Sequence, residues 1–529
     1  MSNPPLFPLQ PTLHSRRSFI GGSASLLLAL TAGRAVAATD RISHHPSFTD
    51  YPFQLGVASG EPDHEGFVIW TRLAPQPLAD GGVIEDAIQV HWMVAEDEAM
   101  TKVVAKGTAV AQRDWAHSVH VEVTGLRPDR WYWYQFKAGA EISPIGRSRT
   151  LESPDRTAAQ TSMLRMAFAS CQHFETGFYN AYEHMLAEAP DIVFHLGDYI
   201  YEGSSRDGQV RRHSGKEIKT LDAYRRRHAQ YKCDPALQAM HQAAPWVVTW
   251  DDHEFDNNYA GDIPEEKGPA EHEAFLQRRA AAYQAYYEHM PLRAACVPKG
   301  PGMSLYRRLQ HGQLVNFHVL DTRQYRTDQP QGDGLRPPSP AEMNPEGTLL
   351  GHAQREWLLA GLTASNTTWN VLAQQVMMAR ADRKAGEAEA YSMDQWPGYE
   401  FERRHLLQAF DERKISNPVV ITGDIHNHWA NELLTDFDPA SNKVVGHEFV
   451  CSSITSGGDG VERPKYYDDL ISENPCVKYH GNRRGYVSCM IRPDQWRTDY
   501  RSVEYVSRPH SPIDTPASFV IENTEMHPA

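Results

Sequence analysis

The stretch DIVFHLGDYIY, at residues 191–201, is largely apolar over its first half and carries Asp198 and Tyr201 in its second. Four other runs share this form, at residues 163–171, 246–254, 314–323 and 419–426, and they end in Cys171, Asp252 with His253, Arg323, and Asp424 with His426. Such runs predict β-strands buried on both faces. In layered α/β folds, ligands bind beyond the carboxyl ends of the strands. Because four of the five endings supply oxygen, nitrogen or sulfur donors, we predict a site for more than one metal ion.

The composition limits the classes of partner. The chain has 529 residues, 41% of them hydrophobic, and a formal net charge of −15 without a long basic run. This length allows two to four domains. The charge argues against a nucleic-acid partner. It would also repel a polyanionic substrate at long range, so a phosphorylated substrate would need local cations or metal ions.

The N-terminus predicts export. Ser15–Ile20 contains the pair Arg16-Arg17, an apolar stretch follows from Ala24 to Ala32, and Ala35–Ala37 supplies the small residues of a cleavage site. The apolar stretch is too short for a stable membrane span. We therefore expect a twin-arginine signal peptide over residues 1–37, recognised by the Tat export machinery of a bacterium. The mature protein would be a periplasmic or secreted monomer.

The rest of the chain divides into three parts. Residues 46–152 alternate short strands with turns and predict a fibronectin-III-like β-sandwich, with Tyr132 at a tyrosine corner. Residues 160–510 alternate apolar strands with helical stretches, notably 221–240 and 271–290, and predict a layered α/β domain. A long loop is expected at 327–347. The tail, 511–529, is polar and contains proline, so we expect it to be partly irregular.

Six cysteines accompany this organisation, and none forms a CxxC pair. An exported protein can form disulfides. Cys451, Cys476 and Cys489 are close enough in sequence for one bridge. Cys171 follows an apolar run, where a cysteine is more often a small buried hydrophobic residue. Because the other runs end in metal-donor residues, we interpret Cys171 as a metal ligand.

The donor types differ in what they select. Tyr201, unless it is a packing aromatic, favours a hard trivalent ion such as Fe³⁺. Asp252 supplies a carboxylate, and Asn257 or its neighbour Asn258 an amide oxygen, which suits hard cations. His253 titrates near neutrality and is placed to protonate a leaving group. Three further residues each have two interpretations. Asp251 is either an acid of the site or a helix cap, and His428 is either a further ligand or a surface residue. Arg323 is either a phosphate clamp or an ion-pair partner.

The ordered motifs HLGDYIYEG, PWVVTWDDHEFDNNYAG and GDIH, with LGVASGEP, ASCQ, LDTRQYR and DQWPGY, resemble those of the calcineurin-like metallophosphatase superfamily, and most closely the PhoD-type alkaline phosphatases. The resemblance covers nearly the whole mature chain. It implies an αββα catalytic domain in which Asp198 bridges two metals, with Tyr201 and His426 on the first. Relatives have Asn at the position of Asp252 and His at that of Asp424, and a further histidine is replaced by glutamine near Gln374.

This resemblance implies Fe³⁺ with Ca²⁺, or two Ca²⁺, as cofactors. It also implies hydrolysis of phosphate mono- and diesters, phospholipids or wall polymers included, by metal-activated hydroxide or oxide. The oxygen-rich second site supports the same choice of calcium. Three alternatives remain at this point: a phospholipase D-like diesterase on the same site, an envelope-binding protein with an inactive metal site, and a metal-storage or redox protein.

Overall fold

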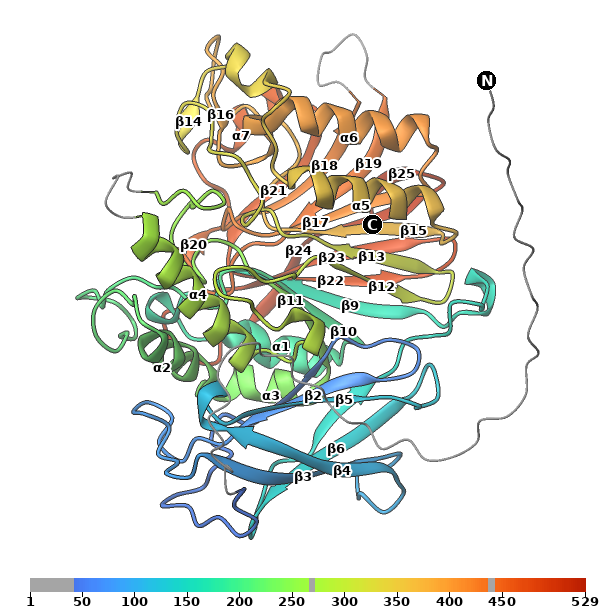
Figure 1. The fold of residues 1–529 in the computed structure, drawn as a ribbon. Coiled ribbons are helices and arrows are strands. Elements are labelled where there is room, and N and C mark those ends of the chain that lie inside the picture. The colour runs from blue at the N-terminus through green and yellow to red at the C-terminus, as the bar shows by residue number, and fades with distance from the viewer. Residues whose placement is uncertain (1–41, 266–271, 436–442) are drawn as a thin grey trace, which may run out of the picture. The chain divides into compact units, whose positions relative to one another are not determined.

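The structure, a computed structural model, describes residues 42–265, 272–435 and 443–529 (Figure 1). The predicted signal peptide, residues 1–37, lies outside these ranges. No helix within them combines the length and the hydropathy that a membrane span requires.

Two large sheets form the middle of the catalytic part. The first has ten strands, with β9 (Leu164–Ala169), β10 (Ile192–Leu196) and β11 (Pro245–Thr249) parallel and adjacent at its centre. The second has eight, with β13 (Val315–Val319), β15 (Trp369–Ala373) and β17 (Pro418–Thr422) parallel and adjacent. All five apolar runs are therefore strands, as predicted. In each of them the residues suited to chemistry follow the strand.

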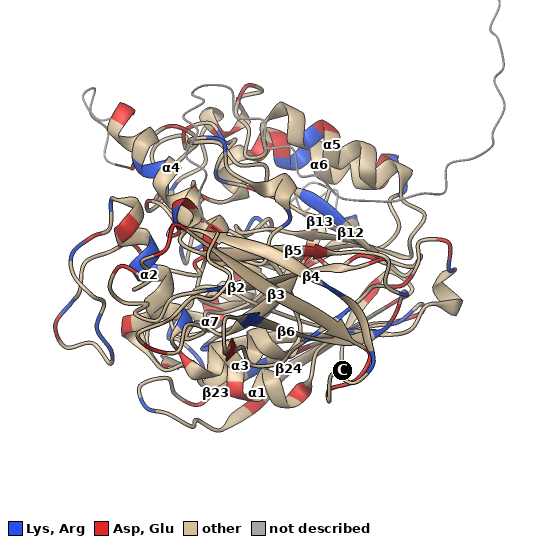
Figure 2. Ribbon diagram, turned by 60° about the horizontal axis from the view of Figure 1, so that its bottom comes forward, with Lys and Arg blue, Asp and Glu red and all other residues tan. Residues whose placement is uncertain are grey.

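The alternation of side chains along β9 shows how these layers are built. Leu164, Met166 and Phe168 face the second sheet and join the apolar core between the sheets, whereas Ala167 and Ala169 face the helices. A strand buried on both faces is apolar at nearly every position, which explains the largely apolar runs; Arg165 of β9 is exposed. In Figure 2 the labelled strands are mostly uncharged, and the charged residues concentrate on helices and connections.

Helices cover the outer face of each sheet, which completes the predicted αββα order. α1 (Asn180–Glu188), α2 (Leu221–Lys232), α3 (Pro235–Ala243) and α4 (His272–His289) pack on the first sheet. α5 (Gly351–Ala364), α6 (Glu400–Glu412) and α7 (Tyr467–Glu473) pack on the second; α5 and α6 lie across the top of Figure 1. The aromatic residues of α4 are buried, so they form a packing stripe.

The predicted helix over residues 221–240 is in fact two helices, α2 and α3. Asp234 ends the first helix and begins the second, because its side chain accepts hydrogen bonds from the backbone N–H groups of Ala236 and Leu237. Pro235 occupies the first turn of α3, where its missing N–H costs nothing. The Asp-Pro pair was the signal for this break in the sequence.

The N-terminal part contributes strands to two sheets. β3 (Ala87–Ala95), β4 (Val103–Gln112), β6 (Trp131–Ala138), β7 (Glu141–Ile142) and β8 (Gly146–Arg149) form one of them. β1 (Val57–Gly60), β2 (Phe67–Arg72) and β5 (Ser118–Val123) instead continue the ten-stranded sheet, since β1 pairs with β11 in parallel. At the expected tyrosine corner, the Tyr132 hydroxyl accepts the N–H of Arg127 at 3.0 Å.

The C-terminal tail is not irregular, so that expectation was wrong. β22 (Gly485–Ile491), β23 (Trp496–Val503), β24 (Ile513–Glu522) and β25 (Glu525–Pro528) form the other edge of the ten-stranded sheet. Pro516 lacks an N–H for the ladder, and the register of β23 against β24 shifts there, between Tyr500 and Ser502. The apolar residues that follow the proline, Phe519 and Ile521, join the core between the sheets.

The remaining strands complete the second sheet and a small ribbon. These strands are β12 (Arg307–His311), β18 (His428–Leu434), β19 (Val444–Val450), β20 (Gly460–Val461) and β21 (Val477–Arg483) in the sheet, and β14 (Leu335–Arg336) with β16 (Tyr391–Ser392) in the ribbon. The expected loop at 327–347 contains only β14 and one short 3₁₀ turn.

Candidate metal centre

Four of the predicted ligands have an unusual backbone. Cys171, Asp198, Asp424 and His426 all have φ between +55° and +68°. This left-handed region is uncommon for residues other than glycine, and it is concentrated at functional sites. The turn after each strand is thus bent sharply so that its side chain points back across the strand ends.

Gly197 makes the first of these turns possible. Its φ is +109°, and a Cβ there would lie 2.3 Å from the Cβ of Asp251. The turns after β10 and β11 are therefore in direct contact. Glu254 joins them further, because its carboxylate accepts the N–H groups of Asp198 at 3.1 Å and Asp251 at 2.9 Å. Only glycine, which has no Cβ, fits at position 197.

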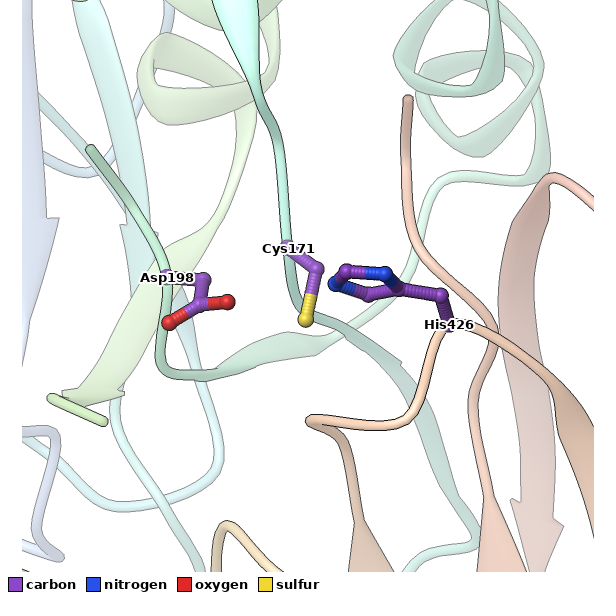
Figure 3. A group of neighbouring side chains, drawn as sticks. All are labelled: Cys171, Asp198 and His426. Carbon is purple, nitrogen blue, oxygen red and sulfur yellow. The ribbon is translucent and has the colours of Figure 1, made fainter. Parts of the chain in front are cut away.

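The first donor group consists of Cys171, Asp198 and His426, whose ligand atoms lie within 4.8 Å of one another. In Figure 3 the three side chains converge from three separate segments. The Tyr201 hydroxyl completes the group: it donates to Oδ2 of Asp198 at 2.7 Å and lies 3.3 Å from Nε2 of His426. The other carboxylate oxygen of Asp198, Oδ1, is buried and has no hydrogen-bond partner among the described residues. Sulfur, carboxylate, phenol and imidazole together fit a metal ion.

Burial disfavours the charged form of these donors. Burial, and then the nearby charge of Asp198, raise the pKa of the Cys171 thiol well above its usual value. Burial also raises the pKa of Asp198 and lowers that of His426 to about 3. A bound cation would favour the deprotonated thiol, phenol and carboxylate, so metal binding here would release protons.

A second group shares Asp198 with the first. One ligand atom each from Asp198, Asp252 and His253 lie within 4.8 Å of one another. Asp424 is close to Asp252, because both carboxylates lie within 4 Å of one nitrogen of Arg323, at 3.6 and 3.8 Å. Burial raises the pKa of Asp424 to about 6. The structure thus brings together oxygen donors beside the first group, with Asp198 common to both.

Arg323, predicted as a phosphate clamp, is instead held in ion pairs. The side chain is fully buried; Nε donates to Asp251, and Nη1 donates to Asp394 at 2.8 Å. Burial alone would lower the pKa of Arg323, but the surrounding carboxylates raise it well above its usual value. The ion-pair interpretation therefore describes Nε and Nη1, whereas Nη2 has no hydrogen-bond partner among the described residues and lies 3.8 Å from Asp252 and 3.6 Å from Asp424. The contact of Nε with Asp251 excludes that carboxylate as a simple helix cap.

His253 has a partner that the sequence did not reveal. Its Nδ1 lies 2.8 Å from Oε2 of Glu202, and 23% of its side chain is exposed. Burial would lower the pKa of His253, but the carboxylates of Glu202, Asp252 and Asp198 raise it well above its usual value. With Nδ1 held by Glu202, Nε2 is the nitrogen available to a substrate. Glu202 follows GDYIY directly, which was the only signal for it.

The hydrogen bonds favour Asn258 over Asn257 beside the second group. The Asn257 side chain points to Glu265, to which Nδ2 donates at 2.8 Å. The backbone N–H of Asn258 donates to Oδ2 of Asp252 at 2.8 Å. The Asn258 side chain donates to Asp333 at 2.7 Å, so its contact with Asp252 is made by the backbone alone.

Two other candidates lie away from the donors. His428 is neither a ligand nor a surface residue: it is buried, and Nδ1 accepts the N–H of Ser452 at 2.9 Å. The amide of Gln374 accepts from Trp396 and donates to Val376, both at 2.7 Å. The glutamine that does reach the site is Gln395, which donates to Asp424 at 3.0 Å.

A further group, His173, Glu175 and His213, has metal-binding residue types but not a metal-binding arrangement. The Tyr231 hydroxyl accepts two backbone N–H groups, so its proton is directed to Nε2 of His213 at 2.9 Å. Nδ1 of His213 then carries a proton and no lone pair. Among the described residues, all six cysteines are free, so the expected bridge between Cys451, Cys476 and Cys489 does not form.

Comparison with known proteins identifies the family. A family model described as PhoD-like phosphatase matches residues 166–500, and one described as PhoD-like phosphatase, N-terminal domain, matches residues 37–152. Alkaline phosphatase D of Bacillus subtilis (strain 168) is 49% identical over 524 residues, which are 98% of this chain and 89% of the relative. A solved structure described as "Structure of PhoD" is also 49% identical; the match covers 91% of this chain and 93% of that chain, with a TM-score of 0.88. The chain therefore belongs to the PhoD-like phosphatase family and is a phosphatase.

Proposed function

We propose that the protein is an exported alkaline phosphatase and phosphodiesterase that uses iron and calcium. One observation carries the assignment of the site: Asp198 lies close both to Cys171 and His426 and to Asp252, as a ligand shared by two metal ions must. Phosphate mono- and diesters, including phospholipid headgroups and wall polymers, are the proposed substrates.

The donor types support Fe³⁺ in the first group and Ca²⁺ in the second. Thiolate, phenolate, imidazole and carboxylate from Cys171, Tyr201, His426 and Asp198 would hold the trivalent ion. Oxygen donors from Asp198, Asp252, Asp424 and Asn258 suit calcium. When bound, the two ions would neutralise the charge of the phosphoryl oxygens and activate water as the nucleophile.

His253 is the proposed general acid. Its Nδ1 is held by Glu202 at 2.8 Å, and its Nε2 remains free to protonate the departing alkoxide. The aromatic face of Tyr201, whose ring centroid is 4.2 Å from that of His253, limits how far the imidazole can tilt. In this scheme Arg323 does not contact the substrate; it holds Asp251 and Asp394 around the second donor group.

Elemental analysis of the mature protein, with a visible spectrum of the same sample, tests the metal assignment. Iron with calcium and a tyrosinate charge-transfer band would support it. Zinc or manganese without such a band would contradict the assignment of Tyr201 as an iron ligand. Assays of phosphate release from monoesters and of alcohol release from diesters would then define the substrate range. Alcohol release from phosphatidylcholine without monoester hydrolysis would favour a phospholipase D-like activity instead.

Export rests on the twin-arginine pair of the N-terminus. The replacement of both Arg16 and Arg17 by lysine should retain the precursor in the cytoplasm, as judged by fractionation and immunoblotting. Unchanged export of that variant would contradict the proposed route.

A further inference from the structure

Arg227 of α2 holds the turn that carries two functional side chains. The residue is 1% exposed, and its Nη1 donates to the backbone carbonyls of Tyr201 and of Gly203, the latter at 3.1 Å. These two carbonyls lie on either side of Glu202. One guanidinium nitrogen therefore fixes the backbone before and after that residue.

The same face of α2 provides a second contact with this turn. Tyr231, one helical turn after Arg227, accepts the backbone N–H of Tyr201 at 3.2 Å. Arg227 thus binds the carbonyl of Tyr201, and Tyr231 binds its N–H. Glu202 adds two further contacts to the 201–203 turn: its carbonyl accepts the N–H of Ile218 at 3.0 Å, and its carboxylate accepts the N–H of Asn257 at 3.2 Å.

Burial of this guanidinium is costly and is not offset by an ion pair. Within the described ranges, no carboxylate lies within ion-pair distance of Arg227, and its Nε and Nη2 have no hydrogen-bond partner. A buried polar group without partners is destabilising and calls for an explanation. An apolar side chain of similar length would fill the space without that cost, but it would leave both carbonyls of the turn unpaired.

We propose that Arg227 is a positioning residue for the reaction. By holding the 201–203 turn, it sets the phenol of Tyr201 against Asp198 and His426, and it sets the Glu202 carboxylate against Nδ1 of His253. Arg227 touches neither the substrate nor a metal ligand's side chain. The inference rests on the proposed role of His253 as general acid.

The test compares Arg227→Met, Arg227→Lys and the control Arg226→Met in the full-length mature protein. Arg226 is the adjacent residue on α2 and is exposed. For each variant we would measure kcat and KM with an alkyl phosphate, a poor leaving group, and with a nitrophenyl phosphate, a good one. Thermal melting and bound-metal content of the same samples separate positioning from unfolding.

The expected result is a change in the ratio of the two kcat values. Arg227→Met should lower kcat for the alkyl ester by about 10- to 100-fold, the range typical of residues that orient a first-sphere group, and lower that for the nitrophenyl ester much less. Arg227→Lys keeps a cation and hydrogen-bond donors but not the planar fork, so its ratio should be intermediate. Arg226→Met should match the wild type. Each kcat is expressed per bound iron, so that any iron lost through displacement of Tyr201 does not count as lost turnover.

The inference would be overturned if folded Arg227→Met had the wild-type kcat ratio, or lost both activities equally. If Arg227→Met does not fold, the ratio in Arg227→Lys decides in the same way. His253→Ala serves as the reference. If His253→Ala shows the leaving-group effect and the Arg227 variants do not, the positioning role of Arg227 is contradicted and the general acid is not. If His253→Ala shows no leaving-group effect, the proposed role of His253 as general acid is itself contradicted.

Discussion

The Tyr201 hydroxyl donates a hydrogen bond to Oδ2 of Asp198 at 2.7 Å, although the two residues are only three positions apart in the chain. The left-handed backbone of Asp198 makes this contact possible, because it turns the chain back after β10. Phenol and carboxylate are thereby placed at one point at the end of the strand. Asp198 and Tyr201 are two of the four donors of the first group.

Tyr201→Phe should therefore remove the tyrosinate absorption and most of the activity. The phenol oxygen is the only atom lost, so the fold should persist. Because a ligand is removed, we expect turnover to fall by more than the roughly 10- to 100-fold typical of outer-sphere changes. Visible spectroscopy, iron analysis and a phosphatase assay measure this. Tyr199→Phe is the matched control, since that hydroxyl contacts His241 at 2.8 Å instead; equal effects of both variants would contradict the prediction.

His253→Ala should discriminate between substrates. A leaving group that needs a proton should react about 10²- to 10⁴-fold more slowly, whereas a nitrophenyl ester should lose much less. Steady-state kinetics with both esters give the comparison. A uniform loss for the two esters would indicate that His253 binds the phosphoryl group or a metal instead of donating a proton.

Asp252→Asn should weaken the second cation without removing the first. The amide keeps one oxygen donor but loses the negative charge, and oxygen donors with charge determine calcium affinity. After a calcium chelator has removed the ion, the variant should need about 10-fold or more calcium to regain half of its activity. Its iron content should stay that of the wild type, and a loss of iron in parallel would show that the two groups are not separate.

Lys232 should make stability rise with pH in the alkaline range. Burial lowers the pKa of this lysine from 10.5 to about 7, and its ammonium lies 4.6 Å from the ring of Trp70. Between about pH 7 and 10.5 the unfolded chain binds the proton and the folded chain does not. The free energy of unfolding therefore increases with pH across this window, and this contribution is lost as the pH falls towards 7.

Lys232→Met should remove that slope. At pH 7 the variant should be more stable than the wild type by an amount on the order of a few kcal/mol, and the difference should shrink as the pH approaches 10.5. Denaturant unfolding at pH 7 and pH 10 measures it. Lys216→Met, at an exposed loop position, should follow the wild type. Identical slopes in wild type and Lys232→Met would assign the pH dependence to other groups.

Removal of residues 511–529 should destabilise the whole catalytic part. The deletion takes away β24 and β25 and exposes the core side of β23. Each buried side chain of the size of Phe519 or Ile521 contributes about 1.5–3 kcal/mol. We expect a lower melting temperature or loss of soluble protein, measured by calorimetry on the purified truncation. Melting like that of the full chain would show that these strands add little.

The strands and most of the metal donors were predictable because they depend on short segments. The apolar runs had to be buried, and the left-handed turns that follow them carry the predicted ligands. Glu202 was missed because its contact with His253 spans 51 residues of sequence and depends on the parallel order of β10 and β11. Arg323 has the residue type of a phosphate clamp; only the folded structure shows that Asp251 and Asp394 already hold it. In the tail, proline and polar residues concealed β24 and β25, the last two strands at one edge of the sheet.

The pairing of β9 has a consequence for the way in which the chain must fold. One neighbour of β9 is β10, some 25 residues later, but the other is β22, more than 300 residues later. The centre of the sheet therefore stays unfinished until nearly the whole polypeptide has been synthesised. Contacts of such high order make folding slow, and the incomplete sheet exposes an apolar edge while it waits. Biogenesis of this enzyme should thus depend on cellular factors that protect the nascent chain until its final residues emerge from the ribosome.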